Sequence, residues 1–187
     1  MRISKKQRIF DRPIKTGINI FFSVFMVILF SCQIAEKKQD SDIKSFLGST
    51  LFIPQSMETE FNKYVNSSEN LLVIIIESED CHECALNNFN MLKYYDKDFS
   101  TYKTNILLIT ERENREEITM LLKNKSINYP VIFDDNHEFV NKNKFMKNPL
   151  FYTFVINNKK EIVWIGSPIT DKRTWDLFCK QMQKNKR

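Results

Sequence analysis

Six consecutive aliphatic residues, at positions 71–76 in the run LLVIIIE, constrain the fold of this chain more than any other feature. Four of the six are β-branched, which favours a strand over a helix. A strand without apolar and polar alternation must be covered on both faces of its sheet. The run therefore predicts the central strand of a parallel or mixed sheet in an α/β protein.

The segments around this strand predict an alternation of helices and strands. Helical spacing over METEFNKYVN, over 84–95 and over ENREEITMLLKNKS predicts three helices. NILLIT and YPVIFD predict two further strands, and HEFVNKNKFMKN predicts an irregular or briefly helical connection. STLFIPQ, which is stopped by Pro54, predicts an edge strand or hairpin.

The last part of the chain predicts a β-hairpin followed by a helix. FYTFVINNKKEIVWIGSPI contains two strand patterns joined by the turn-prone residues NNKK. Trp175, Phe178, Cys179 and Met182 then follow the i, i+3, i+4, i+7 spacing of a core-facing stripe. We expect Cys179 to be a small apolar core residue and not a reactive thiol.

The first 31 residues have the pattern of a secretory signal. Six basic side chains precede the apolar stretch INIFFSVFMVILF, whose length of about 13 residues is short of the ~20 that span a membrane. The following LFSC resembles a lipobox, which implies that Cys32 is acylated and anchors the protein to a membrane. A plain cleaved signal and an uncleaved anchor are the alternatives.

The predicted organisation is a signal peptide at 1–31, a flexible polar tether at 32–46 and one domain at 47–187. Residues 1–31 hold six of the 28 basic and one of the 23 acidic side chains, which leaves 22 of each sign in the remainder. A formally neutral domain lacks the clustered positive charge of nucleic-acid binding proteins, so we expect no nucleic-acid partner.

Two cysteines, Cys81 and Cys84, lie in EDCHECALNNF, where the central strand leads into a helix. A two-residue spacing on a first helical turn brings the two Cα atoms near the ~5.5 Å that a disulfide prefers. The positive end of the helix dipole stabilises a thiolate there and lowers the pKa of the first thiol relative to about 8.5. The pair fits a redox couple, a structural disulfide or part of a metal site.

The order strand, C-x-x-C, helix, strand, helix, strand, hairpin and helix resembles the thioredoxin fold. More narrowly, IIIESEDCHEC and YTFVINNKKEIVWIG resemble the TlpA-like thioredoxins that many Bacteroidetes carry as lipoproteins. The resemblance implies a thioredoxin-like three-layer α/β/α sandwich with a mixed central sheet. It also implies a thiol-disulfide oxidoreductase in the cell envelope, facing the periplasm, which acts on protein thiols or disulfides without a metal or cofactor.

The resemblance assigns roles to both cysteines: Cys81 is the exposed attacking thiol, and Cys84 is the buried thiol that resolves the mixed disulfide. The neighbouring side chains tune the couple. A cationic His82 favours the thiolate, whereas Asp80 and Glu83 oppose it, together with two further acids at 77 and 79. Because the acids outnumber the imidazole, we expect a reducing couple.

Two features depart from the family pattern. Asp80 stands where thioredoxins have a bulky residue, and the following helix has no proline. The position of the family's cis-proline falls on Phe151 or Tyr152, with Pro149 just upstream. Since a non-proline cis bond costs about 2.5–4 kcal/mol, we expect a trans loop whose aromatic side chains cover the thiols. A longer loop that uses Pro149 is the alternative.

Two other functions fit the same residues. A non-catalytic thioredoxin-fold module would bind a partner and keep the cysteine pair as a structural disulfide. A copper-handling protein would use the pair and a distant histidine, for which His137 is the available donor. Structural zinc needs four ligands, and His82, His137 and Cys179 show no second paired spacing.

Overall fold

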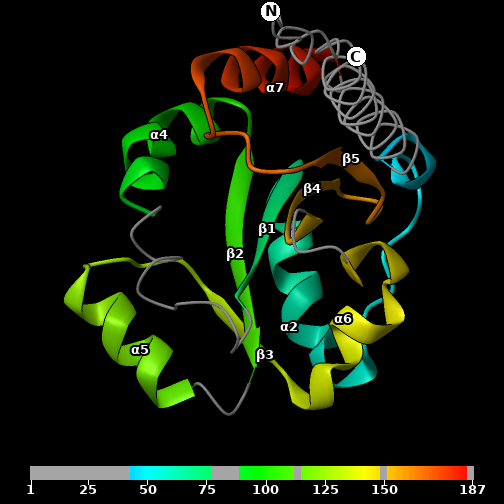
Figure 1. Cartoon of the computed structure of the whole chain (residues 1–187), viewed down its shortest axis with the longest axis vertical. Helices are drawn as coiled ribbons and strands as arrows, with labels where there is room; N and C mark the ends of the chain where they lie inside the picture. The colour runs from blue at the N-terminus through cyan, green and yellow to red at the C-terminus, as the bar shows by residue number, and fades with distance from the viewer. Residues whose placement is uncertain (1–42, 77–88, 112–114, 148–150, 185–187) are drawn as a thin grey trace, which may run out of the picture. The chain divides into compact units, whose positions relative to one another are not determined.

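The computed structural model describes residues 43–76, 89–111, 115–147 and 151–184 (Figure 1). The predicted signal peptide, the lipidation residue Cys32 and the segment EDCHEC lie outside these ranges, as does Pro149. The predictions made for those residues are therefore not tested by the structure. The described residues from Ser45 onward form one compact unit.

Five strands and five helices, with two short 3-10 turns, are the named elements in the described part of this unit. The strands are β1 (Asn70–Ile76), β2 (Thr104–Glu111), β3 (Val131–Asp134), β4 (Thr153–Asn157) and β5 (Ile162–Ile165). The longer helices are α2 (Gln55–Asn66), α4 (Phe89–Thr101), α5 (Arg115–Asn124) and α7 (Lys172–Lys184). The short helix α6 (Glu138–Lys142) lies between the 3-10 turns Asp135–His137 and Lys144–Lys147.

The strands form one mixed sheet in the order β3-β2-β1-β4-β5. The central strand β1 pairs in parallel with β2 and antiparallel with β4, and β2 pairs in parallel with β3. All residues of β1 except Ile74 are at most 5% exposed, as the aliphatic run predicts. This sheet, with helices on both faces, confirms the predicted thioredoxin-like α/β fold.

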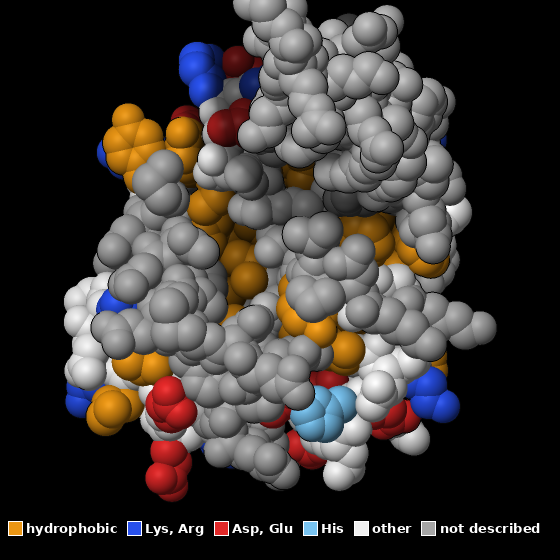
Figure 2. Space-filling view, in the orientation of Figure 1, with side chains coloured by type: hydrophobic (Ala, Val, Ile, Leu, Met, Phe, Trp, Pro, Cys, Tyr) orange, Lys and Arg blue, Asp and Glu red, His pale blue; other side chains and the backbone are white. Residues whose placement is uncertain are grey.

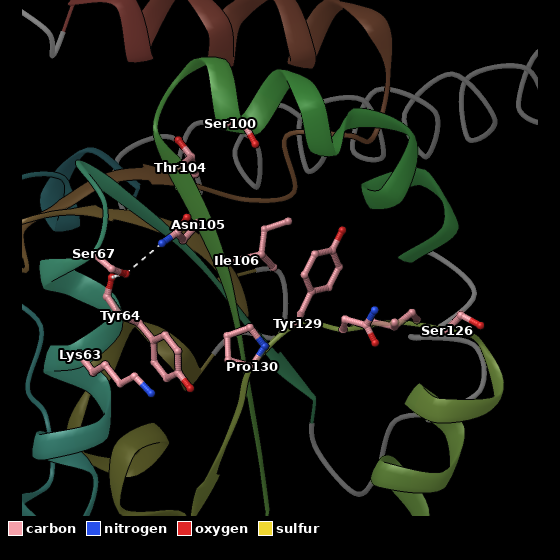
Figure 3. Close-up of a pocket in the computed structure, with 12 residues that line it drawn as sticks. Lys63, Tyr64, Ser67, Ser100, Thr104, Asn105, Ile106, Ser126, Tyr129 and Pro130 are labelled. Carbon is pink, nitrogen blue, oxygen red and sulfur yellow. Dashed lines mark hydrogen bonds between the residues drawn. The ribbon is translucent and has the colours of Figure 1, made fainter.

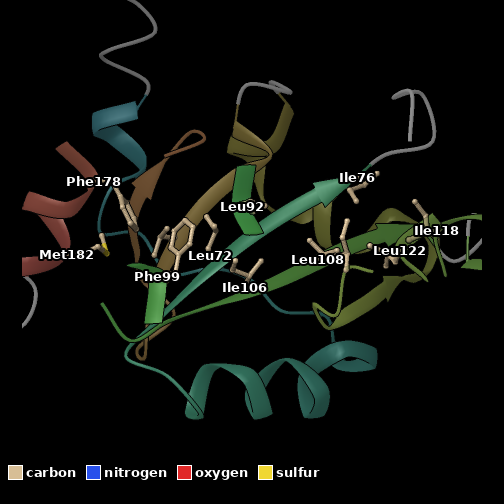
Figure 4. Close-up of a cluster of buried hydrophobic side chains, with 12 residues drawn as sticks. Leu72, Ile76, Leu92, Phe99, Ile106, Leu108, Ile118, Leu122, Phe178 and Met182 are labelled. Atoms are coloured by element: carbon tan, nitrogen blue, oxygen red, sulfur yellow. The ribbon is translucent and has the colours of Figure 1, made fainter. Parts of the chain in front are cut away.

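The two parallel crossovers decide which helices cover which face. The chain moves from β1 to β2 to β3 in one direction across the sheet, so right-handed crossovers put α4 and α5 on the same face. Side chains from α4, α5 and α7 share one core cluster on this face (Figure 4). On the other face Phe61 of α2 packs against Phe139 of α6, with ring centroids 6.1 Å apart.

The predicted strand or hairpin in STLFIPQ is wrong. Thr50 makes a single β-bridge with Glu161, and hydrogen bonds join Gly48 and Ser49 to Ile162 and the Leu51 N–H to the Lys160 carbonyl. The segment is too short to extend this pairing because α2 begins directly after Pro54. It lies along the start of β5 as a brief edge contact.

The closing helix α7 packs through the predicted stripe. Phe178 and Met182 are fully buried, and the ring of Phe178 lies 5.7 Å from that of Phe99 on α4 and 5.4 Å from that of Trp175. Cys179 is half-buried against the same cluster, and burial raises the pKa of its thiol. A raised pKa keeps this cysteine a neutral thiol, in agreement with the expected packing role.

Replacing Phe178 with alanine tests the contribution of this packing. We expect Phe178→Ala to lower the free energy of unfolding by about 3–5 kcal/mol, because it leaves a cavity between α4, α7 and the sheet. Leu177→Ala on the same helix is the matched control, since Leu177 is 50% exposed and its loss should change stability by at most about 0.5 kcal/mol. Urea denaturation of both variants measures the difference, and equal losses would contradict the packing assignment.

Candidate active site

The carboxyl ends of β1, β2 and β3 meet at one edge of the sheet. β1 ends at Ile76, which is paired with Thr110 on β2. The last residue of β2, Glu111, is paired with Asp134 at the end of β3. In open α/β sheets this edge is where ligands and reacting groups gather. The segment that contains the predicted redox pair leaves β1 from this edge.

The structure does not describe the predicted redox residues themselves. Cys81 and Cys84, with the tuning residues Asp80, His82 and Glu83, fall within residues 77–88, outside the described ranges. The loop residues Phe151 and Tyr152 are described and lie at the start of β4. The surroundings of the candidate site are therefore defined by this loop and by the ends of β2 and β3.

The loop is fixed to the end of the central strand by a main-chain hydrogen bond. The Ile75 N–H donates to the carbonyl oxygen of Tyr152 at 2.8 Å, and the peptide bonds that join Phe151, Tyr152 and Thr153 are trans, as expected. Phe151 is buried, and its ring lies 6.4 Å from that of Phe46. Its side chain is thus part of the core, and the prediction that aromatic side chains cover the thiols stays untested.

The side chains of Glu111 and His137 are in contact at this edge. Nδ1 of His137 lies 3.2 Å from Oε1 of Glu111, whose side chain is 8% exposed against 46% for the histidine. Asn136 and His137 both have left-handed backbone angles, with φ of 59° and 54°, which turns the imidazole back toward β2. In Figure 2 this is the one described histidine, and acidic side chains lie beside it.

This contact bears on the copper alternative. One imidazole nitrogen of His137 faces a carboxylate, so only Nε2 is left for a metal ion. Among the residues that the structure describes, no group of three or more histidine, cysteine, aspartate or glutamate side chains is placed to hold a metal. The two cysteines that a copper site would need lie outside the described residues, so the copper alternative stays untested.

Asp134 links the end of β3 to α6. Its carboxylate is buried and accepts hydrogen bonds from the N–H groups of Phe139, at 3.0 and 3.1 Å, and of Val140, at 3.3 Å. Burial raises the pKa of Asp134, and the bonds from α6 and the nearby His137 lower it in part. The carboxylate anchors the first turn of α6 and adds a second titrating group to the edge.

Sequence reasoning missed Glu111 and Asp134 as site residues. The available signal was the position of each carboxylate, directly after a buried strand in LLITE and in VIFD. Because carboxyl ends of parallel strands share one edge, two such acids on adjacent strands are expected to become neighbours.

Comparisons with known proteins found similarity to solved structures. Neither a family model nor a curated protein matches this sequence. A domain of a possible thiol-disulfide isomerase from Cytophaga hutchinsonii is 15% identical over 65% of this chain and 80% of that chain, with a TM-score of 0.49. A thioredoxin-like protein from Porphyromonas gingivalis is 17% identical over 63% and 76%, with a TM-score of 0.46.

A third similar structure is the thioredoxin domain of a thiol-disulfide oxidoreductase from Bacteroides vulgatus. It is 11% identical over 61% of this chain and 79% of that chain, with a TM-score of 0.45. The order and direction of the five strands carry the fold assignment independently of these overlaps.

The raised pKa of Asp134 predicts a pH dependence of stability. The folded protein binds this proton more tightly than the unfolded chain, whose aspartate pKa is 3.8. The contribution of the protonated Asp134 carboxyl to the free energy of unfolding is therefore fully present below pH 3.8. It is lost as the pH rises through the folded-state pKa. Asp134→Asn cannot ionise, so we expect the stability of the wild type relative to this variant to fall as the pH rises from about 3 to 7.

Urea titrations of both proteins across this pH range measure the difference in the free energy of unfolding. Asp134→Ala separates the two roles of the side chain, because it removes the hydrogen bonds to α6 as well as the charge. Asp134→Ala should therefore lower the free energy of unfolding by an additional amount of about 1 kcal/mol at every pH. A wild-type advantage over Asp134→Asn that grows with pH would contradict the raised pKa.

Proposed function

We propose that this protein is a thiol-disulfide oxidoreductase of the cell envelope that uses Cys81 and Cys84. The observation that carries the proposal is the place of this pair in the fold: it follows β1, the central strand, and precedes α4. Four residues separate Ile76 from Cys81 along the chain, so in sequence the pair follows closely on the carboxyl end of β1.

The proposed reaction is a two-step exchange. The thiolate of Cys81 attacks a disulfide of the substrate protein, forms a mixed disulfide and releases one substrate thiolate. The thiolate of Cys84 then attacks the sulfur of Cys81, closes the internal disulfide and releases the second substrate thiolate. The two protons of the cysteine pair end on the two substrate thiolates, and two electrons pass to the substrate. An external dithiol reverses the steps and restores the pair.

The charges at the carboxyl edge support a reducing couple. Asp80 and Glu83 flank the cysteines in sequence, with His82 as the opposing imidazole, and Glu111 adds a buried carboxylate at the end of the neighbouring strand. Negative charge disfavours a thiolate, and a less stable thiolate form makes the dithiol a better electron donor.

The reduction potential of the pair tests this proposal against a structural disulfide. We expect the couple to equilibrate with glutathione or dithiothreitol buffers at a potential above about −300 mV, because structural bridges lie below that value. Cys81→Ser should lose reduction of insulin disulfides, and Cys179→Ser is the matched control that should keep it. Full insulin reduction by Cys81→Ser, or a potential far below this limit, would contradict the enzyme assignment.

Cys84→Ala should convert the transient intermediate into a stable one. Without the resolving thiol, Cys81 keeps the attacked substrate as a mixed disulfide. Non-reducing gels of cells that express this variant should show adducts that disappear with dithiothreitol, and Cys81→Ser/Cys84→Ala should show none. Mass spectrometry of the adducts would then identify the substrate class.

We also propose that residues 1–31 direct export, that Cys32 carries the lipid anchor and that the residues after it tether to the membrane the unit that begins at Ser45, two residues before the predicted start at 47. The basic and apolar pattern of the first residues and the LFSC sequence support this assignment. Within the described residues, none of the helices has the length and apolar character needed to cross a bilayer.

Metabolic labelling with an alkyne fatty acid tests the anchor. We expect the wild-type protein to take up the label and to sediment with membranes, because an acyl chain contributes about 0.8 kcal/mol per buried methylene group. Cys32→Ala should lose the label, whereas Cys179→Ser should keep it. Equal labelling of wild type and Cys32→Ala would contradict lipidation at Cys32.

A further inference from the structure

One side of the first half of β2 has no strand beside it. β2 has eight residues and β3 only four, and the pairing between them begins at Leu108 with Val131. Residues 104–107 pair with β1 on one side, and no strand of the described chain pairs with them on the other. Within the described residues, the sheet therefore has an unpaired edge at the amino end of β2, where Thr104 and Ile106 are 4% and 5% exposed.

Pro130 explains why the pairing stops there. The Leu108 N–H donates to the Pro130 carbonyl oxygen at 2.9 Å. In a parallel ladder, the next hydrogen bond would run from the N–H of residue 130 to the carbonyl oxygen of Ile106. Proline has no N–H, so this bond cannot form. The main-chain groups of Thr104 and Ile106 that face away from β1 have no strand partner in the described part of the chain.

A groove of about 550 Å³ lies where β3 is missing. Its walls come from the end of α2, the end of α4, the start of β2 and the segment that leads into β3 (Figure 3). Tyr64 and Tyr129 lie on either side of Pro130, and the remaining lining side chains are mostly hydroxyls and amides. The volume is within the usual range of about 300–1,000 Å³ for ligand sites.

The charge of the groove has one sign. Lys63 supplies the one ionised side chain among the twelve lining residues, and no carboxylate is among them. Its Nζ lies 5.7 Å from the ring centroid of Tyr64, which also lines the groove. An acidic group is the electrostatic complement of this wall.

We propose that the groove binds an extended, acidic peptide segment of a partner protein, which adds as a short strand to the free edge of β2. An extended chain is the ligand whose alternating N–H and C=O groups match an unpaired strand edge. Four strand residues rise about 13 Å, which suits the stretch that β3 leaves open. This site lies at the opposite end of β2 from Glu111, so it does not depend on the proposed redox chemistry.

Amide NMR of the full chain, held in a mild detergent, tests this proposal with the peptide acetyl-Thr-Val-Asp-Val-Thr-Val-amide as the probe. We expect the amide signals of Thr104 and Ile106 to shift on titration and their hydrogen exchange to slow. The amide of Leu107 faces β1 and serves as the internal control, which should not gain protection. The same peptide with alternate N-methylated amides should bind at least about tenfold more weakly, because it cannot complete the ladder.

Lys63→Met tests the charge preference. We expect this variant to bind the aspartate peptide roughly two- to fivefold more weakly, the range of an exposed ion pair, and to bind an asparagine version unchanged. Lys97→Met, at an exposed lysine of α4 outside the groove, is the matched control and should bind both peptides like the wild type.

Three results would overturn the proposal. The first is no shift at Thr104 and Ile106 at millimolar peptide. The second is equal binding of the N-methylated peptide, which would show that the ligand does not add as a strand. The third is a shift of the same amides with protein concentration alone, which would assign the edge to a second copy of this chain. None of these three results depends on whether Cys81→Ser keeps or loses insulin reduction. The peptide-binding proposal and the redox proposal can therefore be contradicted independently.

Discussion

Burial of β1 on both faces is the constraint on which the rest of this structure depends. Its aliphatic side chains pack with α4, α5 and α7 on one side and with α2 on the other. Each fully buried side chain contributes about 1.5–3 kcal/mol relative to exposure. A strand of this kind needs a hydrogen-bonded neighbour at each edge, which β2 and β4 supply. Because the side chains at 71–76 are all aliphatic, this strand offers no reactive or charged side chain, and polar groups can lie only beyond its ends.

Buried ionisable side chains lie at the carboxyl edge of the sheet, beside the end of β1. Glu111 and Asp134 continue two buried strands by one polar residue each, and both stay buried because α6 and the turn before it fold over them. His137 reaches Glu111 only through the left-handed turn that Asp134 helps to fix. A change in the charge of either carboxylate would thus alter the electrostatic potential at the edge where β1 ends and the C-x-x-C segment begins.

The regular helices and strands of this fold could be predicted from the sequence, because the spacing of apolar residues indicates which side chains are buried. The run at 71–76, the hairpin and the stripe of α7 are examples. The Glu111–His137 contact was not readable, since it joins residues far apart through a turn in which Asn136 adopts positive φ without being glycine. The groove was missed for another reason: NILLIT and YPVIFD look equally long, and only the register shows that Pro130 ends their pairing early. The inward packing of Phe151 depends on Phe46, which no local pattern links to it.

The hydrogen bonds that join residues 48–51 to the β4–β5 hairpin have a consequence for the outer edge of the sheet. They cover the start of an outer strand that would otherwise present bare main-chain groups to other molecules. Removal of the residues before Pro54 would uncover that strand, and it would also remove the buried side chain of Leu51 and the hydrogen bonds between Phe52 and Asn143. An uncovered strand edge of this kind favours edge-to-edge association between molecules.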